Sequence, residues 1–272
     1  MNDTTTMAGA VSPGERELTS TMAYLTRVLK TPTIGRCWEE LAVQAREAGW
    51  SHEDYLATVL QRQVADREAN DTALRIAGAH FPQVKTLEDF NTDHQPSLRR
   101  DILAHLATTT WVVKADSLLF LLGPPGVGKT HLATGLGIKA IQAGRFVLFD
   151  TATDWISRLT AAQAAGRLER ELKRLRRYKL LIIDEVGYVP FDHDATNLFF
   201  QFVAARYEQG VILVTSNMPF GRWGEIFSDD IVAAAMIDRL VHHAEVITLT
   251  GDSYRTRSRR ELLAGPPPAT HS

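Results

Sequence analysis

The sequence has 272 residues, a length that fits one mid-sized domain accompanied by a smaller module. Hydrophobic residues make up 44% of the chain and charged residues 23%, an ordinary globular composition that excludes disorder of the whole chain. The formal net charge of -2 excludes a uniformly basic protein, so contacts with DNA or RNA are expected only from local basic clusters.

Targeting and membrane signals are missing from the sequence. No apolar stretch approaches the ~20 residues that a membrane helix requires, which predicts a protein without a membrane partner. Residues 1–14 have neither the basic start nor the apolar core of a secretory signal. The single cysteine, Cys37, allows no intramolecular disulfide and suits a reducing compartment. Together these features favour a cytoplasmic protein.

The N-terminal part of the chain predicts a small helical bundle. Apolar residues recur three or four positions apart from Leu18 to Leu29 and from Ile34 to Ala45, which is typical of one buried helix face. Ser51 followed by Asp54 resembles a capping box that opens a third helix, with apolar residues from Leu56 to Val64 facing inward. Acidic residues outnumber basic ones here, so two roles stay open: packing or oligomerisation, and direct contact with DNA.

Prolines interrupt the helical pattern at Phe81-Pro82 and at Pro96, which predicts a linker between two domains. Beyond the linker, short apolar runs alternate with helical patterns; the runs are 118–122, 146–150, 180–184, 211–215 and 246–249. Continuous apolar strands separated by helices predict a parallel sheet covered on both faces, which is a doubly wound α/β domain. The predicted segments are a disordered tail (1–14), the helical bundle (15–76), the linker (77–96), the α/β domain (97–260) and a second disordered tail (261–272).

A phosphate-binding loop directly follows the first apolar run and matches the pattern G-x-x-x-x-G-K-[ST] at every specified position. Its residues are Gly123, Pro124, Pro125, Gly126, Val127, Gly128, Lys129 and Thr130, and His131 completes the predicted cofactor-binding set. Glycines at 126 and 128 allow backbone amides to turn toward anionic oxygens, and the following helix adds the positive end of its dipole. Lys129 is expected to contact the β and γ phosphates of ATP, and the Thr130 hydroxyl to coordinate Mg²⁺.

Two carboxylates, Asp184 and Glu185, stand at the end of the third apolar run. Ligands of open α/β sheets bind at the carboxyl ends of the strands. Asp184 is therefore expected to hold Mg²⁺, directly or through water, and Glu185 to orient the attacking water or accept its proton. A Glu directly after the metal-binding Asp favours hydrolysis over phosphoryl transfer to a metabolite. The expected reaction converts ATP to ADP and phosphate.

Asn217 follows the fourth apolar run and reaches the same edge of the sheet. Its amide can hydrogen-bond both the γ-phosphate and the nucleophilic water, which makes it a candidate catalytic residue. An ordinary turn residue before Met218-Pro219 is the alternative interpretation, because Asn is common in turns.

The densest basic cluster lies between residues 167 and 179. Its candidate DNA-binding residues are Arg167, Arg170, Lys173, Arg174, Arg176 and Arg177. Leu168, Leu172 and Leu175 give the segment one apolar face, so the charges are expected to point outward. A merely solvated helix face is the alternative. If the cluster does contact DNA, binding is expected to be directed to the backbone and strongly salt-dependent.

Several of these motifs resemble the AAA+ ATPases, in the branch that contains replication initiators and helicase loaders. They are the run from Gly126 to Ala133, Asp184-Glu185 and Thr215-Ser216-Asn217. Four further segments, 84–90, 215–227, 233–243 and 251–257, are similar to the IstB-type transposition helper proteins of bacterial insertion sequences. The resemblance covers nearly the whole chain, from 15 to 260.

The resemblance implies an AAA+ P-loop NTPase with a parallel five-stranded sheet, preceded by a small N-terminal helical domain. It also implies an ATPase that assembles as a homo-oligomer on double-stranded DNA, deforms the DNA, and recruits and activates a cognate transposase, with ATP bound between subunits. Arg239 matches the family's arginine finger, which reaches a neighbour's γ-phosphate, and Arg255 matches its second sensor. Few residues follow the last predicted strand, so no C-terminal helical lid is expected.

Two other functions fit the same residues. One is a replicative helicase loader of the DnaC type, whose target would be a hexameric helicase rather than a transposase. The other is a nucleotide-gated DNA scaffold with little hydrolysis. Replacement of Glu185 by Gln separates the scaffold from an ATPase, because only the ATPase would lose turnover.

Overall fold

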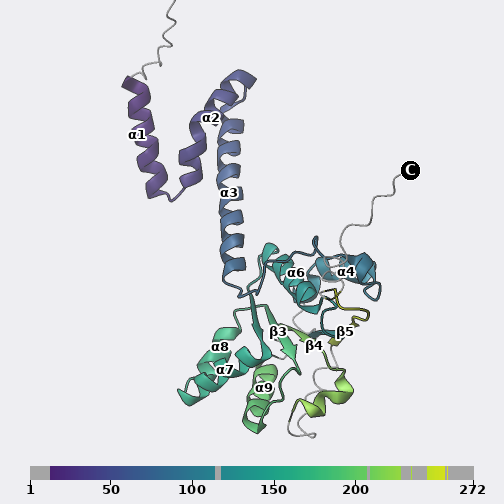
Figure 1. The fold of residues 1–272 in the computed structure, drawn as a ribbon. Coiled ribbons are helices and arrows are strands. Elements are labelled where there is room, and N and C mark those ends of the chain that lie inside the picture. Colours follow the sequence, from purple (N-terminus) through teal and green to yellow (C-terminus); the bar gives the residue numbers. More distant parts are fainter. Residues whose placement is uncertain are drawn as a thin grey trace, which may run out of the picture. The chain divides into compact units, whose positions relative to one another are not determined.

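The computed structural model describes residues 13–113, 118–206, 209–227, 234, 244–254 and 256. The chain divides into two compact units, residues 1–73 and residues 74–272 (Figure 1). No helix within these described residues is long and apolar enough to cross a membrane. The predicted C-terminal tail and the expected absence of a helical lid concern residues outside the described ranges, whereas Pro13 and Gly14 of the predicted N-terminal tail already belong to the first helix.

Unit 1 contains α1 (Pro13–Val28), α2 (Pro32–Ala48) and most of α3 (His52–Ala77). The predicted capping role of Ser51 at the start of α3 is confirmed: the backbone N–H of Asp54 donates to Oγ of Ser51 at 3.0 Å, and that hydroxyl donates to the Asp54 carboxylate at 2.7 Å. Gly49 ends α2 in the left-handed conformation with φ of 67°, which glycine adopts without strain.

The predicted burial of the apolar residues in unit 1 is largely wrong. Val59 is buried, but Leu25, Leu56 and Val64 are 42%, 56% and 54% exposed. The reason is that α3 is joined to α2 by polar contacts: Oε1 of Gln63 accepts from the backbone N–H of Thr33 at 3.1 Å. Because this contact between α2 and α3 is polar, the apolar faces of the helices are not covered by other described residues.

Unit 2 is built on a parallel sheet with the strand order β2-β3-β4-β1-β5, which confirms the predicted five-stranded parallel sheet. The strands are β1 (Leu118–Leu122), β2 (Val147–Thr151), β3 (Leu180–Val186), β4 (Val211–Ser216) and β5 (Ala244–Thr248). The helices of this unit are α4 (Arg100–Ala107), α5 (Thr110–Val113), α6 (Lys129–Gln142), α7 (Ala152–Ala164), α8 (Leu168–Leu175) and α9 (His193–Arg206), with short 3-10 helices at Thr92–His94 and Phe220–Glu225.

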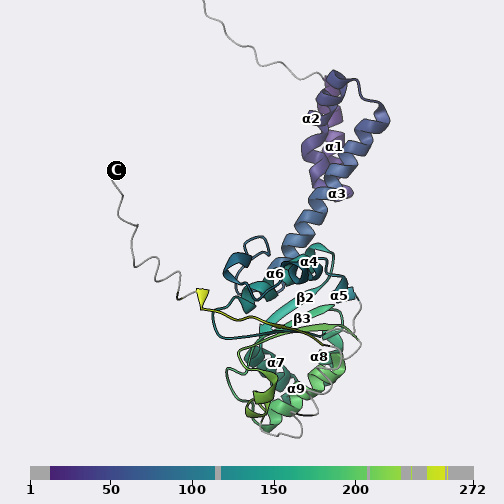
Figure 2. The same ribbon diagram turned by 90° about the vertical axis from the view of Figure 1, so that its right-hand side faces the viewer.

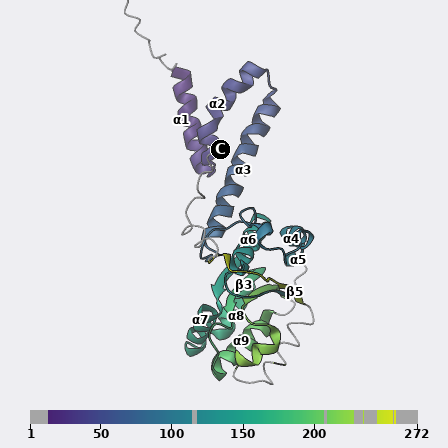
Figure 3. The same cartoon turned by 45° about the vertical axis from the view of Figure 1, so that its right-hand side comes forward.

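Helices cover both faces of the sheet, as the continuous apolar strands predict. Figures 2 and 3 show α4, α5 and α6 on one face and α7, α8 and α9 on the other. Successive residues of β1 alternate between the two layers: Phe120 packs in the core on the α7–α9 side, and Leu119 and Leu121 pack in the core on the α4–α6 side. The central strands are therefore buried on both sides.

Residues 77–96 are part of unit 2 and not the predicted linker. Ala79, Leu87 and Phe90 are buried in the core on the α4–α6 side, and the carbonyl of Ala79 accepts a hydrogen bond from the backbone N–H of Phe149 at 2.8 Å. Prolines end helices and so make a segment look like a linker in sequence, but a segment without regular secondary structure can still pack into a core. The close fit depends on Gly135 of α6, where an added Cβ would lie 2.6 Å from Leu87.

Candidate nucleotide-binding site

The predicted phosphate loop connects β1 to α6 at the carboxyl edge of the sheet. Gly126 and Gly128 both have positive φ values, 85° and 100°, which favour glycine. Space also demands glycine, because an added Cβ at Gly126 would lie 2.1 Å from Oγ of Ser253 and one at Gly128 would lie 3.0 Å from the ring of Phe90. The loop is thus a tight cradle of backbone groups at the start of a helix, which is suited to anionic oxygens.

Lys129 opens α6 and is almost fully buried in this loop. Its ammonium donates to the carbonyl of Gly123 at 2.6 Å and to the carbonyl of Pro124 at 2.8 Å. These contacts hold the positive charge beside the glycine cradle, where it adds to the positive end of the helix dipole. An incoming phosphate oxygen could replace carbonyl oxygens as the acceptor.

Asp184 and Thr130 meet across the sheet edge, as predicted for a shared metal site. The Thr130 hydroxyl lies 3.0 Å from Oδ2 of Asp184, and the Thr215 hydroxyl donates to Oδ1 of the same carboxylate. Burial raises the pKa of Asp184 above its usual value, while the hydrogen bonds from Thr215 and Thr130 and the charge of Lys129 act to lower it.

The oxygen atoms of Thr130 and Asp184 are ligands that Mg²⁺ prefers, and two protein ligands leave room for phosphate and water oxygens. Within the described residues no cluster of three or more His, Cys, Asp or Glu side chains could enclose a metal ion. This donor set therefore fits a magnesium ion that arrives with a nucleotide better than a metal held by the protein alone.

Glu185 occupies a β-bulge at the end of β3. Ile183 pairs with Val214 and Val186 pairs with Ser216, so both Asp184 and Glu185 lie opposite Thr215. Glu185 has φ of 63°, in the left-handed region, and its backbone N–H donates to the Thr215 hydroxyl at 3.0 Å. Its side chain is exposed and lines the same cavity as the phosphate loop. The exposed carboxylate of Glu185 is therefore adjacent in sequence to the buried carboxylate of Asp184.

A cavity of about 950 Å³ brings these groups together. Gly126 to His131, Asp184, Glu185 and Thr215 line it. Residues that the sequence analysis did not propose also line it, among them Phe90, Asn91, His94 and Gln95 from the supposed linker, and Tyr254. The Gln95 amide donates to the carbonyl of Val127 at 3.0 Å and so fastens this segment to the phosphate loop. Two sequence signals could have indicated it: the glycines of α6, which permit the close approach, and the family resemblance of residues 84–90.

The remaining predicted site residues have different outcomes. Gly123, Pro124 and Pro125 are not among the described residues that line the cavity. Asn217 does not line it either; its Oδ1 is buried beside Gly187 with no hydrogen-bond partner in the described structure. Its predicted contact with the γ-phosphate stays a prediction. Arg239 and Arg255, the predicted arginine finger and second sensor, lie outside the described residues.

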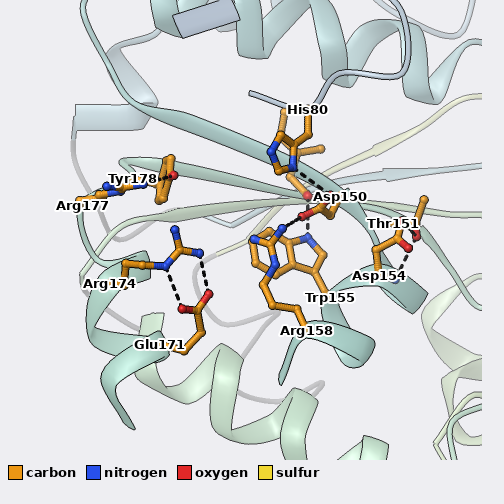
Figure 4. Close-up of polar contacts among 11 residues, drawn as sticks. His80, Asp150, Thr151, Asp154, Trp155, Arg158, Glu171, Arg174, Arg177 and Tyr178 are labelled. Carbon is orange, nitrogen blue, oxygen red and sulfur yellow. Dashed lines mark hydrogen bonds and ion pairs between the residues drawn. The ribbon is translucent and has the colours of Figure 1, made fainter. Parts of the chain in front are cut away.

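The basic cluster spans Arg167 at the start of α8, the helix itself and the turn that follows it, and its six candidate residues are all exposed. Figure 4 shows that some of these cations are already engaged: Arg174 donates two hydrogen bonds to Glu171, at 2.8 and 2.6 Å, and Arg177 donates to the Tyr178 hydroxyl at 2.6 Å. By contrast, Arg170 and Lys173 have no ion-pair partner among the described side chains. Leu175 is buried, which confirms that the charges point outward.

Comparison with known proteins gives close relatives over most of the chain. A family model described as IstB-like ATP binding protein matches residues 25–262. A Pseudomonas aeruginosa protein named for ATP binding in insertion sequence IS21 is 40% identical over 223 residues, which cover 82% of this chain and 84% of that protein. A Geobacillus stearothermophilus protein named for ATP binding in insertion sequence IS5376 is 37% identical and covers 85% of this chain and 92% of that protein.

Two solved structures share the fold of unit 2 at low sequence identity. The crystal structure of a DNA replication initiation factor aligns with a TM-score of 0.53 and 20% identity over 67% of this chain and 55% of that one. AMPPCP-bound DnaA from Aquifex aeolicus aligns with a TM-score of 0.52 and 21% identity over 68% of this chain and 56% of that one. This chain thus spans just over half of each protein. The likeness concerns the fold, which is the predicted AAA+ P-loop NTPase fold.

Proposed function

Because the chain belongs to the IstB-like ATP binding protein family, we propose that it is an ATP-dependent, DNA-binding transposition helper that hydrolyses ATP to ADP and phosphate. The observation that carries the proposal is that the glycine cradle, the Thr130–Asp184 pair and the exposed carboxylate of Glu185 line one shared cavity. A binding site needs only the cradle. The additional carboxylate supports chemistry on the bound nucleotide.

The proposed hydrolysis divides the work among residues of unit 2. The loop amides and Lys129 bind the phosphates, and Thr130 and Asp184 would hold Mg²⁺. Mg²⁺, when bound, neutralises charge that develops on the transferred phosphoryl group. Glu185 orients the attacking water and accepts its proton, because its carboxylate is accessible from the cavity whereas that of Asp184 is buried and engaged. Asn217 would contact the water or the γ-phosphate after a local rearrangement.

We further propose that the protein acts as a homo-oligomer in the cytoplasm, with ATP bound between subunits. The uncovered apolar residues of α1 and α3 support self-association, because a second copy could bury them. In such an assembly Arg239 would reach the γ-phosphate of a neighbour and Arg255 would act in its own subunit's site. An arginine supplied in trans contributes ~10³ to 10⁵ in rate, which would couple hydrolysis to assembly.

The proposed nucleic-acid partner is double-stranded DNA, contacted through the outward cations of α8, and the proposed protein partner is the cognate transposase. The exposure of Arg170 and Lys173 without ion-pair partners in the described structure supports a role in phosphate contact. The Pseudomonas aeruginosa and Geobacillus stearothermophilus relatives are both named after insertion sequences, which supports a role in transposition. The ATP-driven assembly would deform the DNA and recruit and activate the transposase on it.

Replacement of Glu185 by Gln tests the proposal. We expect Glu185→Gln to bind ATP as the wild type does, to form longer-lived assemblies on duplex DNA, and to lose at least ~100-fold in turnover, the usual contribution of a general base. Lys129→Ala serves as the control that fails to bind nucleotide. Unchanged turnover in Glu185→Gln would remove Glu185 from the mechanism. Negligible turnover by the wild type on DNA would favour the scaffold, and capture of a hexameric helicase in place of a transposase would favour the loader.

A further inference from the structure

We propose that Thr215 is the positioning residue that holds Asp184 and Glu185 in their working arrangement. The inference rests on the proposed ATP hydrolysis and deepens it, because it names what fixes the two carboxylates relative to each other. Thr215 lies on β4, within the T-S-N run that ends the strand. Its side chain contacts both residues of the pair.

The β-bulge requires such a residue. Where the β3–β4 register shifts, two residues of β3 face one residue of β4, and that residue is Thr215. An extra residue in one strand disrupts the ladder and re-aims a side chain, and bulges are frequent beside active sites. Glu185 takes up the irregularity with its left-handed backbone, φ of 63°. The backbone N–H of Glu185 then needs an acceptor, and the Thr215 hydroxyl supplies it at 3.0 Å.

The hydroxyl of Thr215 is used twice in this arrangement. It accepts a hydrogen bond from the Glu185 N–H, and it donates its only proton to Oδ1 of Asp184. Thr215 is 1% exposed and Asp184 is 3% exposed, so solvent has little access to replace either bond. Without this hydroxyl, Oδ1 of Asp184 would lose one hydrogen-bond donor, and the backbone N–H of Glu185 would lose its acceptor. One atom therefore links the buried, metal-binding carboxylate to the backbone that presents the exposed one.

Isosteric variants separate this role from simple packing. Thr215→Val keeps the shape and removes the hydroxyl, whereas Thr215→Ser keeps the hydroxyl. Thr196→Val is a matched control, because Thr196 is equally buried in α9, does not line the cavity, and its hydroxyl has no hydrogen-bond partner in the described structure. Three quantities are measured for each protein: ATP turnover on duplex DNA, nucleotide affinity from a fluorescent ATP analogue, and hydrogen exchange of the peptide that contains Glu185.

We expect Thr215→Val to lose 10- to 100-fold in turnover, the usual effect of removing a residue that orients metal ligands, while nucleotide affinity changes less than about threefold. Exchange of the Glu185 peptide should become faster. Thr215→Ser should restore both turnover and protection, and Thr196→Val should match the wild type in all three measurements.

The readouts distinguish failure of this inference from failure of the proposed function. Wild-type protection of the Glu185 peptide in Thr215→Val would overturn the inference whatever the turnover, because the bulge would then not depend on the hydroxyl. Faster exchange combined with wild-type turnover would also overturn it. A wild-type protein that does not hydrolyse ATP would refute the proposed hydrolysis and leave the exchange measurement to decide the role of Thr215 in the bulge.

Discussion

The salt dependence of DNA binding tests the proposed role of α8 most directly. The perturbation is the double substitution Arg170→Ala/Lys173→Ala, which removes two exposed cations that have no ion-pair partner among the described side chains. On a helix these positions lie opposite the apolar face that ends in the buried Leu175, so neither side chain supports the core. The change should therefore leave the fold intact and act on the DNA contact alone.

The expected magnitude follows from counterion release. Each phosphate contact contributes about 0.9 to the slope of log affinity against log salt concentration, so loss of two contacts should lower the slope by about 1.8. The weakening should be the same on duplexes of different sequence, because phosphate contacts carry no sequence information. Affinities of the full-length protein, measured by fluorescence anisotropy from low to physiological salt, give the slope.

The control variant removes the same net charge from elsewhere in unit 2. Arg99→Ala/Arg222→Ala deletes two cations that are already paired, with Asp101 and Glu225 respectively, and should leave the slope as in the wild type. A wild-type slope in the α8 variant would refute the assignment of these two residues as phosphate contacts. An equal fall in both variants would show that general charge, and not the α8 surface, drives binding.

Two further substitutions probe the packing around glycine. Gly126→Ala should weaken ATP binding more than about tenfold in a nucleotide titration, because an added Cβ would lie 2.1 Å from Oγ of Ser253. Gly144→Ala is the control and should leave ATP binding unchanged, because Gly144 has a similar φ of 81° but open space around it. Gly210→Ala should lower the free energy of unfolding by about 1–3 kcal/mol, because its Cβ would lie 2.1 Å from the buried Arg206 guanidinium. In urea denaturation the same change should cost less in an Arg206→Met background, and an equal cost in both backgrounds would contradict the steric explanation.

The sheet and the phosphate loop could be predicted from sequence because their signals are local. Each strand is a continuous apolar run, and the loop from Gly123 to Thr130 carries its chemistry in consecutive residues. The meeting of Thr130 with Asp184 could also be predicted, since strands of a parallel sheet end at one edge. The family resemblance covered the same motifs and led to the same fold.

The parts that could not be predicted depend on long-range packing. Residues 77–96 have the proline content of a linker, yet Leu87 is held against α6 at Gly135, far away in sequence. In unit 1 the apolar spacing correctly predicted helices, but not that Gln63 would join two of them through a polar contact and leave the stripe exposed. Helical periodicity shows that a face is apolar; it does not show what covers the face.

The same limit applies at the catalytic edge. The position of Asn217 after β4 predicts a contact with the γ-phosphate, whereas the contact of Thr215 with the two carboxylates depends on the bulge in the β3–β4 register. A register shift of one residue arises from the pairing of two strands, and neither strand shows it alone. The T-S-N sequence predicts polar residues at this edge of the sheet. The pairing of β3 with β4 determines that Thr215 is the residue that contacts Asp184 and Glu185.

The phosphate loop is held from two directions, and this arrangement explains how it can present its amides inward. The carbonyl of Val127 accepts from the Gln95 amide at 3.0 Å, and the carbonyl of Gly126 accepts from the backbone N–H of Tyr254 at 3.0 Å. Carbonyls tied to flanking segments cannot turn toward the cavity, so the loop is left with its N–H groups for an anion. Tyr254 immediately precedes Arg255. The hydrogen bond that ties the carbonyl of Gly126 therefore also holds Tyr254, the residue next to the proposed second sensor, against the phosphate loop.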